Sequence, residues 1–299
     1  MQIALRATLK VLAPYILVGP AILFVLVFLY APVVFSGVLS VSDWNFISPD
    51  MKFVGLDNYR VILRDPQFQT ALLNTVLYCA VLIPAQIAVP LALATLILRI
   101  RKPFLANAYK AALFLPTMLA YSTAGMAWLW LFDPTNGFFN TLLGWFGLAP
   151  SRWYSDPSLA LWCVVIVSFW KNFGLNMLLF AAALASVPGS VMEAAKLDGA
   201  GSWRAFWTVE LPLISPTFFF VAVTTTMSVL DDIAATIDVL TEGGPFGQST
   251  NVLYYMFERG LRFFQFGQAS ASAVLIILLV LIVTWAQVRM FERRVHYES

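Results

Sequence analysis

Residues 187–216 read VPGSVMEAAKLDGAGSWRAFWTVELPLISP, a polar segment that lies between two long apolar runs. Ser190 followed three residues later by Glu193 has the spacing of a capping box, in which the two side chains bond free amides at the start of a helix. Residues 194–197 continue a helix, and Gly199 permits the left-handed backbone that ends one. The segment therefore predicts a short, rigid helix between two apolar stretches.

The composition around this segment identifies a membrane protein. Of 299 residues, 60% are hydrophobic and only 11% are charged, against roughly 25% charged residues in an ordinary soluble domain. A water-exposed globule of this size cannot be covered with so few charges. Disordered and nucleic-acid-binding classes are excluded as well, because each needs a polar or strongly basic composition. The mean hydropathy of +0.80 leads to the same conclusion.

The apolar runs predict an all-α integral membrane protein. A helix that crosses ~30 Å of hydrocarbon needs about 20 mostly apolar residues, and six stretches qualify. The first is too long for a removed signal peptide and is interpreted as a retained anchor. We expect a single transmembrane domain over residues 1–299. Its spans are expected at about 12–40, 70–98, 108–132, 159–187, 211–233 and 266–290, with the polar loop at 188–212.

The few charges predict the orientation of these spans. Positively charged residues stay on the cytoplasmic side of a membrane. If both termini are cytoplasmic, eleven of the eighteen Lys and Arg residues lie inside and six outside, with Lys171 within a span. Five acidic residues then lie inside and eleven outside, so the balance is +6 inside and −5 outside. We therefore expect six transmembrane helices with both termini cytoplasmic.

Motifs for catalysis and for metal binding are missing from the sequence. It contains no Walker-type phosphate loop, Gly-x-Ser-x-Gly, His-Glu-x-x-His or Cys-x-x-Cys. The one histidine is His296, and Cys79 and Cys163 lie in apolar runs, where they are interpreted as small buried hydrophobic residues. We expect no catalytic residue, metal or cofactor in this chain. Energy for any transport must come from an ion gradient or from a partner.

Several motifs in order along the chain carry a family resemblance. Glu193-Ala194-Ala195, Asp198-Gly199-Ala200, Leu211-Pro212 and Pro216 resemble the EAA loop of binding-protein-dependent ABC importer permeases. More of the chain is similar to the maltose-type and glycerol-3-phosphate-type permeases within that family. The matching positions are FVGLDNY at 53–59, Asn74-Thr75, Leu115-Pro116, Gly137 with Asn140, Trp170-Lys171, and Gly243-Gly244-Pro245. The similarity extends over almost the full length.

The resemblance implies a function and a set of partners. It implies the MetI-like permease fold in a multi-pass protein of the bacterial plasma (inner) membrane, which imports a carbohydrate or a related polyol or polyol phosphate. The expected partners are a second homologous permease in a heterodimer, two ATPase subunits that bind ATP and Mg, and an extracytoplasmic substrate-binding protein; no nucleic acid is expected. The residues that would couple this chain to the ATPase are Glu193, Ala194, Ala195, Leu197, Asp198 and Gly199.

Two alternatives stay open on the residues alone. The polar loop is equally explained as a well-capped connection with no partner. An ion-coupled secondary carrier that works without an ATPase would use Lys171 and Asp232 as coupling charges. Such carriers are often built from inverted repeats, and no repeat is visible in this sequence.

Lys171 is the one charge that interrupts a span. It lies twenty-two residues before Glu193, or about 33 Å along a helix, which places it toward the outer half of the bilayer. One interpretation is a lysine that snorkels to the lipid headgroups. The other places it on the translocation path with Asn172 and Asn176, since the family has sugar-contacting residues in this part of the corresponding span.

The outer end of the fifth span has polar residues that would form the wall of the translocation path opposite Lys171. These are Ser228, Asp231 and Asp232, of which Asp232 is the better candidate because it lies eleven positions before Gly243. A solvated helix end would explain them equally. A lysine and an aspartate around one cavity would suit a polyhydroxylated ligand, and the lysine could instead bind a phosphate or carboxylate. Residues 243–247 are expected to form an outer turn, since no Lys-Ser/Thr follows them.

Overall fold

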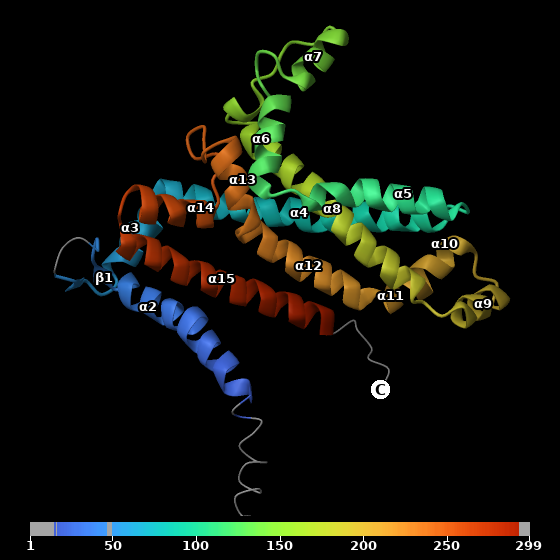
Figure 1. Ribbon diagram of the computed structural model, residues 1–299, viewed down its shortest axis with the longest axis horizontal. Helices are drawn as coiled ribbons and strands as arrows, with labels where there is room; N and C mark the ends of the chain where they lie inside the picture. Colours follow the sequence, from blue (N-terminus) through green and yellow to red (C-terminus); the bar gives the residue numbers. More distant parts are fainter. Residues whose placement is uncertain (1–14, 16, 47–49, 293–299) are drawn as a thin grey trace, which may run out of the picture. The chain divides into compact units, whose positions relative to one another are not determined.

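The computed structural model describes residue 15 and residues 17–46 and 50–292, and these are mostly helical (Figure 1). Arg6, Lys10, His296 and the two termini, on which the predicted orientation partly depends, lie outside the described residues. The chain forms two compact units. The N-terminal unit comprises the residues up to 64 together with 256–275, and the main unit comprises 65–255 together with the residues after 275. Each is described by itself.

The N-terminal unit contains a π-helical turn, two helices and a small sheet. The turn is Leu26–Tyr30, followed by α2 (Ala31–Ser40), β1 (Ser42–Asp43), β2 (Lys52–Phe53) and α3 (Asp57–Arg64). The strands pair antiparallel, with Ser42 opposite Phe53, a departure from the all-α expectation. Asn58 Nδ2 donates to Ser40 O at 3.0 Å and to Ser42 O at 2.9 Å. The FVGLDNY motif thus ties α3 to the end of α2.

The main unit is entirely helical in its described residues. Its elements are α4 (Pro66–Leu98), α5 (Pro103–Phe114), a 3₁₀ turn (Leu115–Met118), α6 (Tyr121–Leu131), α7 (Phe138–Trp145), a 3₁₀ turn (Trp153–Ser155), α8 (Ala160–Ala185), α9 (Gly189–Leu197), α10 (Ser202–Ala205), a π-helical turn (Phe206–Glu210), α11 (Leu211–Leu213), α12 (Ser215–Leu230) and α13 (Asp232–Leu240). Three further elements, α14 (Val252–Phe257), a π-helical turn (Glu258–Arg262) and α15 (Phe266–Glu292), connect or extend across the two units.

Among the described residues, four helices are long and apolar enough to cross a membrane: Leu17–Ser40, Pro66–Leu98, Ala160–Ala185 and Phe266–Met290. Two bent pairs pass the same test, so the number rises to six if each pair is one span. Pro103–Met118 and Tyr121–Leu131 meet at 100°, and Ser202–Leu213 and Ser215–Leu230 meet at 65°. The six-span count stays a prediction.

The two bends have local backbone causes. Leu119 and Ala120 are extended, with ψ of 147° and 148°, so the helix stops and restarts between Met118 and Tyr121. The expected span 211–233 is interrupted at Ile214, with ψ of 7°, and again at Asp231. Neither of these two expected spans is therefore one continuous helix.

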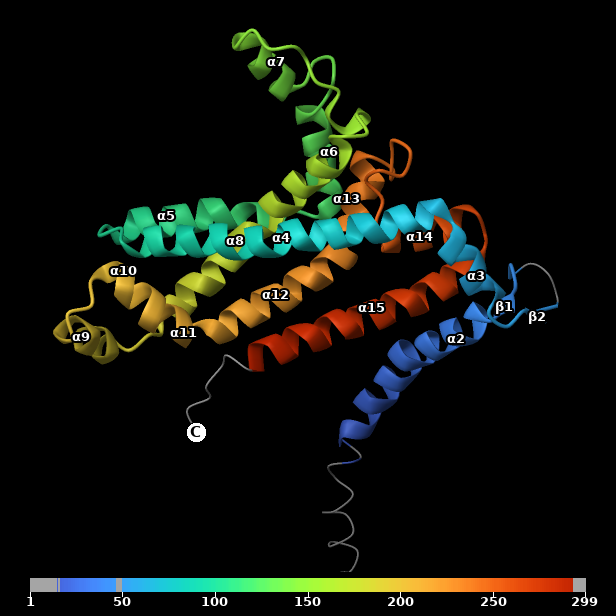
Figure 2. The same ribbon diagram turned by 180° about the vertical axis from the view of Figure 1, so that it is seen from behind.

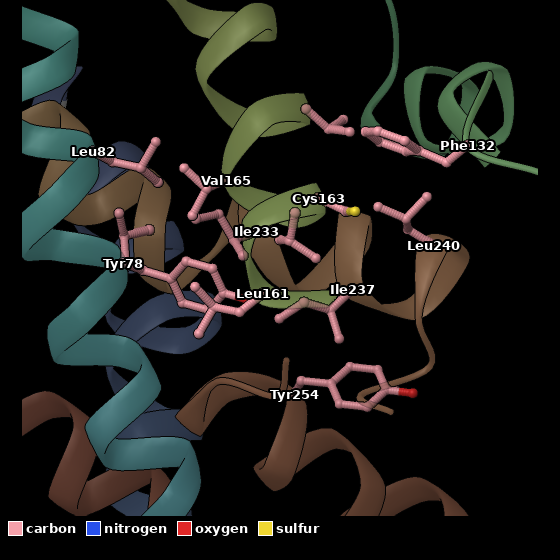
Figure 3. Packing of buried hydrophobic residues seen from close by; sticks show 13 residues of the cluster. Tyr78, Leu82, Phe132, Leu161, Cys163, Val165, Ile233, Ile237, Leu240 and Tyr254 are labelled. Carbon is pink, nitrogen blue, oxygen red and sulfur yellow. The ribbon is translucent and has the colours of Figure 1, made fainter. Parts of the chain in front are cut away.

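A hydrophobic cluster holds the centre of the main unit (Figure 3). Cys163 on α8 lies within it, is 2% exposed and is a free thiol, as expected of a small buried hydrophobic residue. The labelled members come from α4, α8, α13 and α14 and from the residue that follows α6: Tyr78, Leu82, Phe132, Leu161, Cys163, Val165, Ile233, Ile237, Leu240 and Tyr254. This cluster fixes the start of α13 against α8.

α5 and α8 approach each other to backbone contact at Gly174. A Cβ atom at this position would lie 2.0 Å from Leu113 O and 2.9 Å from the Cα of Phe114. Helix crossings this close need a residue without a side chain. The crossing sets the position of α8 relative to the bend that follows α5.

We expect Gly174→Ala to destabilise the protein by about 1–3 kcal/mol, because the added carbon forces two backbones apart. The measurement is the thermal midpoint of the detergent-purified protein. Gly144→Ala in α7 is the matched control, since a Cβ there meets nothing within 4 Å. Equal midpoints for the two variants would show that the close approach is not required.

Candidate functional site

Four polar side chains from four helices meet beside the bends of the main unit. The Tyr121 hydroxyl at the start of α6 lies 2.9 Å from Asp232 Oδ2 and 3.0 Å from Asn172 Oδ1. Ser228 Oγ donates to the same Asp232 oxygen at 2.6 Å, and Asn172 Nδ2 donates to Ser228 Oγ at 3.0 Å. We call Tyr121, Asn172, Ser228 and Asp232 the polar cluster. Figure 1 shows α6, α8, α12 and α13 converging at this point.

The breaks between helices determine where the side chains of the polar cluster lie. Asp231 has φ of −94° and ψ of −63°, which separates α12 from α13 and places Asp232 in the first turn of α13. A helix N-terminus favours a nearby carboxylate. The break also frees carbonyls at the end of α12, where Asn251 Nδ2 donates to Val229 O at 3.2 Å. The polar cluster therefore lies where two helices end and restart.

Lys171 lies next to the cluster but points elsewhere. Its side chain is buried, with 4% of the residue exposed, and its Nζ donates to Thr117 O at 3.2 Å. The ammonium lies 4.0 Å from the centroid of the Tyr121 ring, and Thr117 Oγ1 donates to Lys171 O at 2.9 Å. Thr117 belongs to the turn before the 100° bend. The ammonium is therefore bonded to the protein itself.

A cavity of about 150 Å³ opens beside the polar cluster. Of the expected path residues, Asn172, Asn176, Ser228 and Asp232 line it together, whereas Lys171 does not. Asp231 is exposed at the break between α12 and α13 and does not line the cavity either. The complete lining is Asn172, Leu175, Asn176, Thr224, Thr225, Ser228 and Asp232. The expectation of a lysine and an aspartate around one cavity is wrong for the lysine.

Asn176 is held at the cavity from the side of α4. Its Nδ2 donates to Gln86 Oε1 at 2.9 Å, and Gln86 Nε2 donates to Phe169 O at 3.2 Å. Both side chains are almost fully buried, at 6% and 1% exposure. A buried amide pair with both members bonded has a fixed orientation. Asn176 is thus a rigid part of the cavity wall.

Sequence reasoning missed Tyr121, Gln86, Thr224 and Thr225. The two threonines lie three and four positions before Ser228, so helical spacing alone puts them on its face. No comparable signal exists for Tyr121, since the 100° bend brings it to Asp232. Gln86 is a polar residue in a long apolar helix, and this position alone does not predict that it lies beside a cavity.

The Gly243-Gly244-Pro245 motif forms a turn that is bonded to α4. Gly243 has φ of +76°, and the Gly244-Pro245 peptide is cis. Asn74 Nδ2 donates to three carbonyls of the turn, those of Gly247 at 3.3 Å, Gln248 at 2.9 Å and Thr250 at 3.0 Å. Tyr78 OH, also on α4, donates to Ser249 O at 2.8 Å, so two side chains of this helix hold the turn.

The predicted helix of the polar loop is present as α9, but its start differs from the expectation. Pro188 is the N-cap residue, its carbonyl accepts from Val191 N at 3.1 Å, and no side chain caps the helix. The capping box of Ser190 and Glu193 is therefore wrong: the helix begins at Gly189, which puts Ser190 inside it. The other end is confirmed, because Gly199 has φ of +76°.

The end of α9 is a Schellman motif. Ala200 N donates to Ala195 O at 2.9 Å, and Gly199 N donates to Lys196 O at 3.1 Å. Figure 2 shows α9 and α10 together near the end of α8 that is remote from α6. A hollow of about 430 Å³ opens there, lined by Thr95, Leu98, Arg99, Leu184, Met192, Lys196, Ala200, Gly201, Ser202, Ala205, Phe206 and Glu210.

The six expected coupling residues do not share one surface. Leu197 is 89% exposed, and Glu193, Ala194, Asp198 and Gly199 are exposed as well. Ala195 is 9% exposed, and α9 contacts α10 in the main unit. Ala195 is therefore buried whereas the other five residues are exposed, and the coupling role of the six stays a prediction.

Comparison with known proteins identifies the family. Residues 13–297 match the family model described as "Binding-protein-dependent transport system inner membrane component". The chain belongs to this family. The permease is 31% identical over 285 residues to the sn-glycerol-3-phosphate transport system permease protein UgpA of Pectobacterium atrosepticum, covering 95% of this chain and 96% of the relative. It is 33% identical over 288 residues to UgpA of Brucella abortus, with the same coverage.

Solved structures support the same fold. A bacterial ABC transporter for import of the acidic polysaccharide alginate matches with a TM-score of 0.84 at 22% identity, covering 97% of this chain and 99% of that chain. The MetNI methionine ABC transporter matches with a TM-score of 0.57 at 15% identity, covering 78% and 100%. The permease therefore has the fold of ABC importer permeases, as the EAA resemblance implied, and the carrier without an ATPase is not supported.

We expect Asn74→Ala to release the turn at residues 243–250, because three carbonyls lose their donor at once. A buried polar group left unpaired costs about 1–3 kcal/mol, so amide hydrogen exchange in peptides covering this turn should accelerate about tenfold.

Thr70→Ala, one turn earlier on α4, is the control for this exchange measurement. The Thr70 hydroxyl bonds only Pro66 O within its own helix. Unchanged exchange in Asn74→Ala would mean that the turn is held by other bonds.

Proposed function

We propose that the permease crosses the bacterial inner membrane six times with both termini cytoplasmic. It imports a carbohydrate or a related polyol or polyol phosphate that an extracytoplasmic binding protein delivers. Two separate ATPase subunits, which bind ATP and Mg, drive the transport. The charge balance of +6 inside and −5 outside supports this orientation, and the two bent helix pairs would supply the fifth and sixth crossings if each pair is one span.

The observation that carries the proposal is the polar cavity, of which this chain provides one wall. Its lining offers a carboxylate, two amides and three hydroxyls, a set of donors and acceptors that matches the hydroxyl groups of a sugar or polyol. Its volume of about 150 Å³ lies below the roughly 300–1,000 Å³ of typical ligand pockets. A second, homologous permease would supply the opposite wall, so the functional unit is a heterodimer.

The names of similar proteins support the proposed class of solute and its delivery by a binding protein. The UgpA proteins are named for transport of sn-glycerol 3-phosphate. A second solved structure, of a bacterial alginate transporter with a TM-score of 0.84 and 22% identity, is in complex with a periplasmic protein that holds an alginate pentasaccharide. The names of the relatives support a hydroxyl-rich solute, and this complex supports an extracytoplasmic protein that delivers it.

α9 is proposed as the contact with an ATPase subunit. Glu193 and Asp198 are exposed acids that would meet basic residues of the ATPase, and Leu197 is an exposed apolar side chain beside them. The Schellman end at Gly199 and the buried Ala195 keep the helix rigid against the rest of the main unit. A rigid helix transmits the movement of an ATPase, whereas a flexible linker would absorb it.

Reconstitution into proteoliposomes tests this function. The two permeases, the ATPase and the binding protein are assembled with ATP inside, and uptake of radiolabelled maltose, glycerol and sn-glycerol 3-phosphate is measured. Uptake should require the ATPase, ATP and the binding protein together. Uptake that an imposed proton or sodium gradient drives without the ATPase would instead establish a secondary carrier.

We expect Leu197→Asn to uncouple ATP hydrolysis from uptake. The side chain is 89% exposed, so the change leaves the folding of this chain intact and acts only on a docked partner. Loss of a buried apolar anchor at an interface costs about 2 kcal/mol, so the ratio of solute imported to ATP hydrolysed should fall more than tenfold. Leu197→Met should retain the ratio. Normal coupling in Leu197→Asn would remove α9 from the ATPase interface.

A further inference from the structure

The cavity has one charged side chain in its lining, and that charge is negative. Asp232 is the carboxylate, and the other lining residues are amides, hydroxyls and Leu175. The nearby cation, Lys171, is bonded to Thr117 O, lies 4.0 Å from the centroid of the Tyr121 ring and does not line the cavity. A solute in the cavity therefore meets a carboxylate directly, and meets the lysine only as a more distant charge.

The bonds to Asp232 leave one oxygen available. Tyr121 OH and Ser228 Oγ both lie in donating position to Oδ2, at 2.9 Å and 2.6 Å. Oδ1 accepts no hydrogen bond from any residue in the described part of the chain. It is thus a free acceptor in the lining of a cavity.

We infer that this cavity selects a neutral polyhydroxylated solute and rejects phosphorylated or carboxylated ones. The inference rests on the proposed function and narrows its substrate class. Solute hydroxyls donate to Asp232 Oδ1, and they both donate hydrogen bonds to and accept them from Asn172, Asn176 and Thr224. A phosphate or carboxylate would lie beside a like charge in a site of low dielectric, with no cation among the lining residues that this chain contributes. The permease would then differ in substrate from the UgpA relatives, which are named for an anionic solute.

The reaction rates of charged thiol reagents report the sign of the electrostatic potential in the cavity directly. The native thiols are removed by Cys79→Ala and Cys163→Ala, and Thr224→Cys places a single thiol in the lining. The assembled, detergent-solubilised importer is treated with methanethiosulfonates that carry an ammonium, a sulfonate or no charge. Each rate is divided by the rate of the same reagent with free 2-mercaptoethanol.

The normalised ammonium rate should exceed the sulfonate rate by at least about tenfold, the lower end of the enrichment that a charged cleft gives its counter-ion. The isosteric Asp232→Asn change should bring the ratio close to one. Lys171→Gln should raise the ratio above that of the parent, because it removes the distant positive charge. A sulfonate rate equal to or above the ammonium rate would overturn the inference, and so would a thiol that none of the three reagents reaches.

Uptake measurements distinguish a failure of this inference from a failure of the proposed function. In the proteoliposomes described above, sn-glycerol 3-phosphate should not accumulate above an ATPase-inactive control. ATP-dependent accumulation of sn-glycerol 3-phosphate would overturn the substrate inference while supporting the importer. Gradient-driven uptake without the ATPase would refute the importer, and the thiol ratio would still decide the charge of the cavity.

Discussion

The structure depends on one constraint: a backbone carbonyl or amide inside a membrane must find its hydrogen-bond partner within the protein. Continuous helices satisfy it by themselves, but the main unit interrupts its helices at residues 119–120, 214 and 231. Polar side chains bond carbonyls beside the first and the last of these interruptions. Lys171 Nζ bonds Thr117 O before the first break, and Asn251 Nδ2 bonds Val229 O before the last.

These bonds explain why the site lies where it does. A break brings the end of one helix and the start of another to the same place, so Tyr121 and Asp232 meet although 111 residues separate them. The side chains that bond the freed carbonyls are fixed in the process, which holds the lysine away from the cavity. The carboxylate beside it is left to face the solute. The position of the charge is thus a consequence of how the breaks are satisfied.

Much of this arrangement was predictable from the sequence, and the rest has identifiable causes. Apolar runs predicted the long helices, glycine at position 199 predicted the left-handed end of α9, and the EAA resemblance predicted the family. Asn172 and Asn176 were expected on the translocation path because the family has sugar-contacting residues in this part of the span. The bend at residues 119–120 was not predictable, since Leu119 and Ala120 carry no breaker of their own, and the positions of Tyr121 and Lys171 follow from it. The capping box failed because α9 begins at Gly189, so that Ser190 lies inside the helix and Pro188, which has no side-chain acceptor, is the N-cap residue.

The most direct test of the account is a cryo-electron microscopy structure of the assembled importer with its transported solute bound. The account predicts a second permease on the open side of the cavity, a solute hydroxyl within hydrogen-bond distance of Asp232 Oδ1, and Lys171 Nζ still bonded to Thr117 O. A solute phosphate or carboxylate paired with Lys171, with that side chain turned into the cavity, would contradict it.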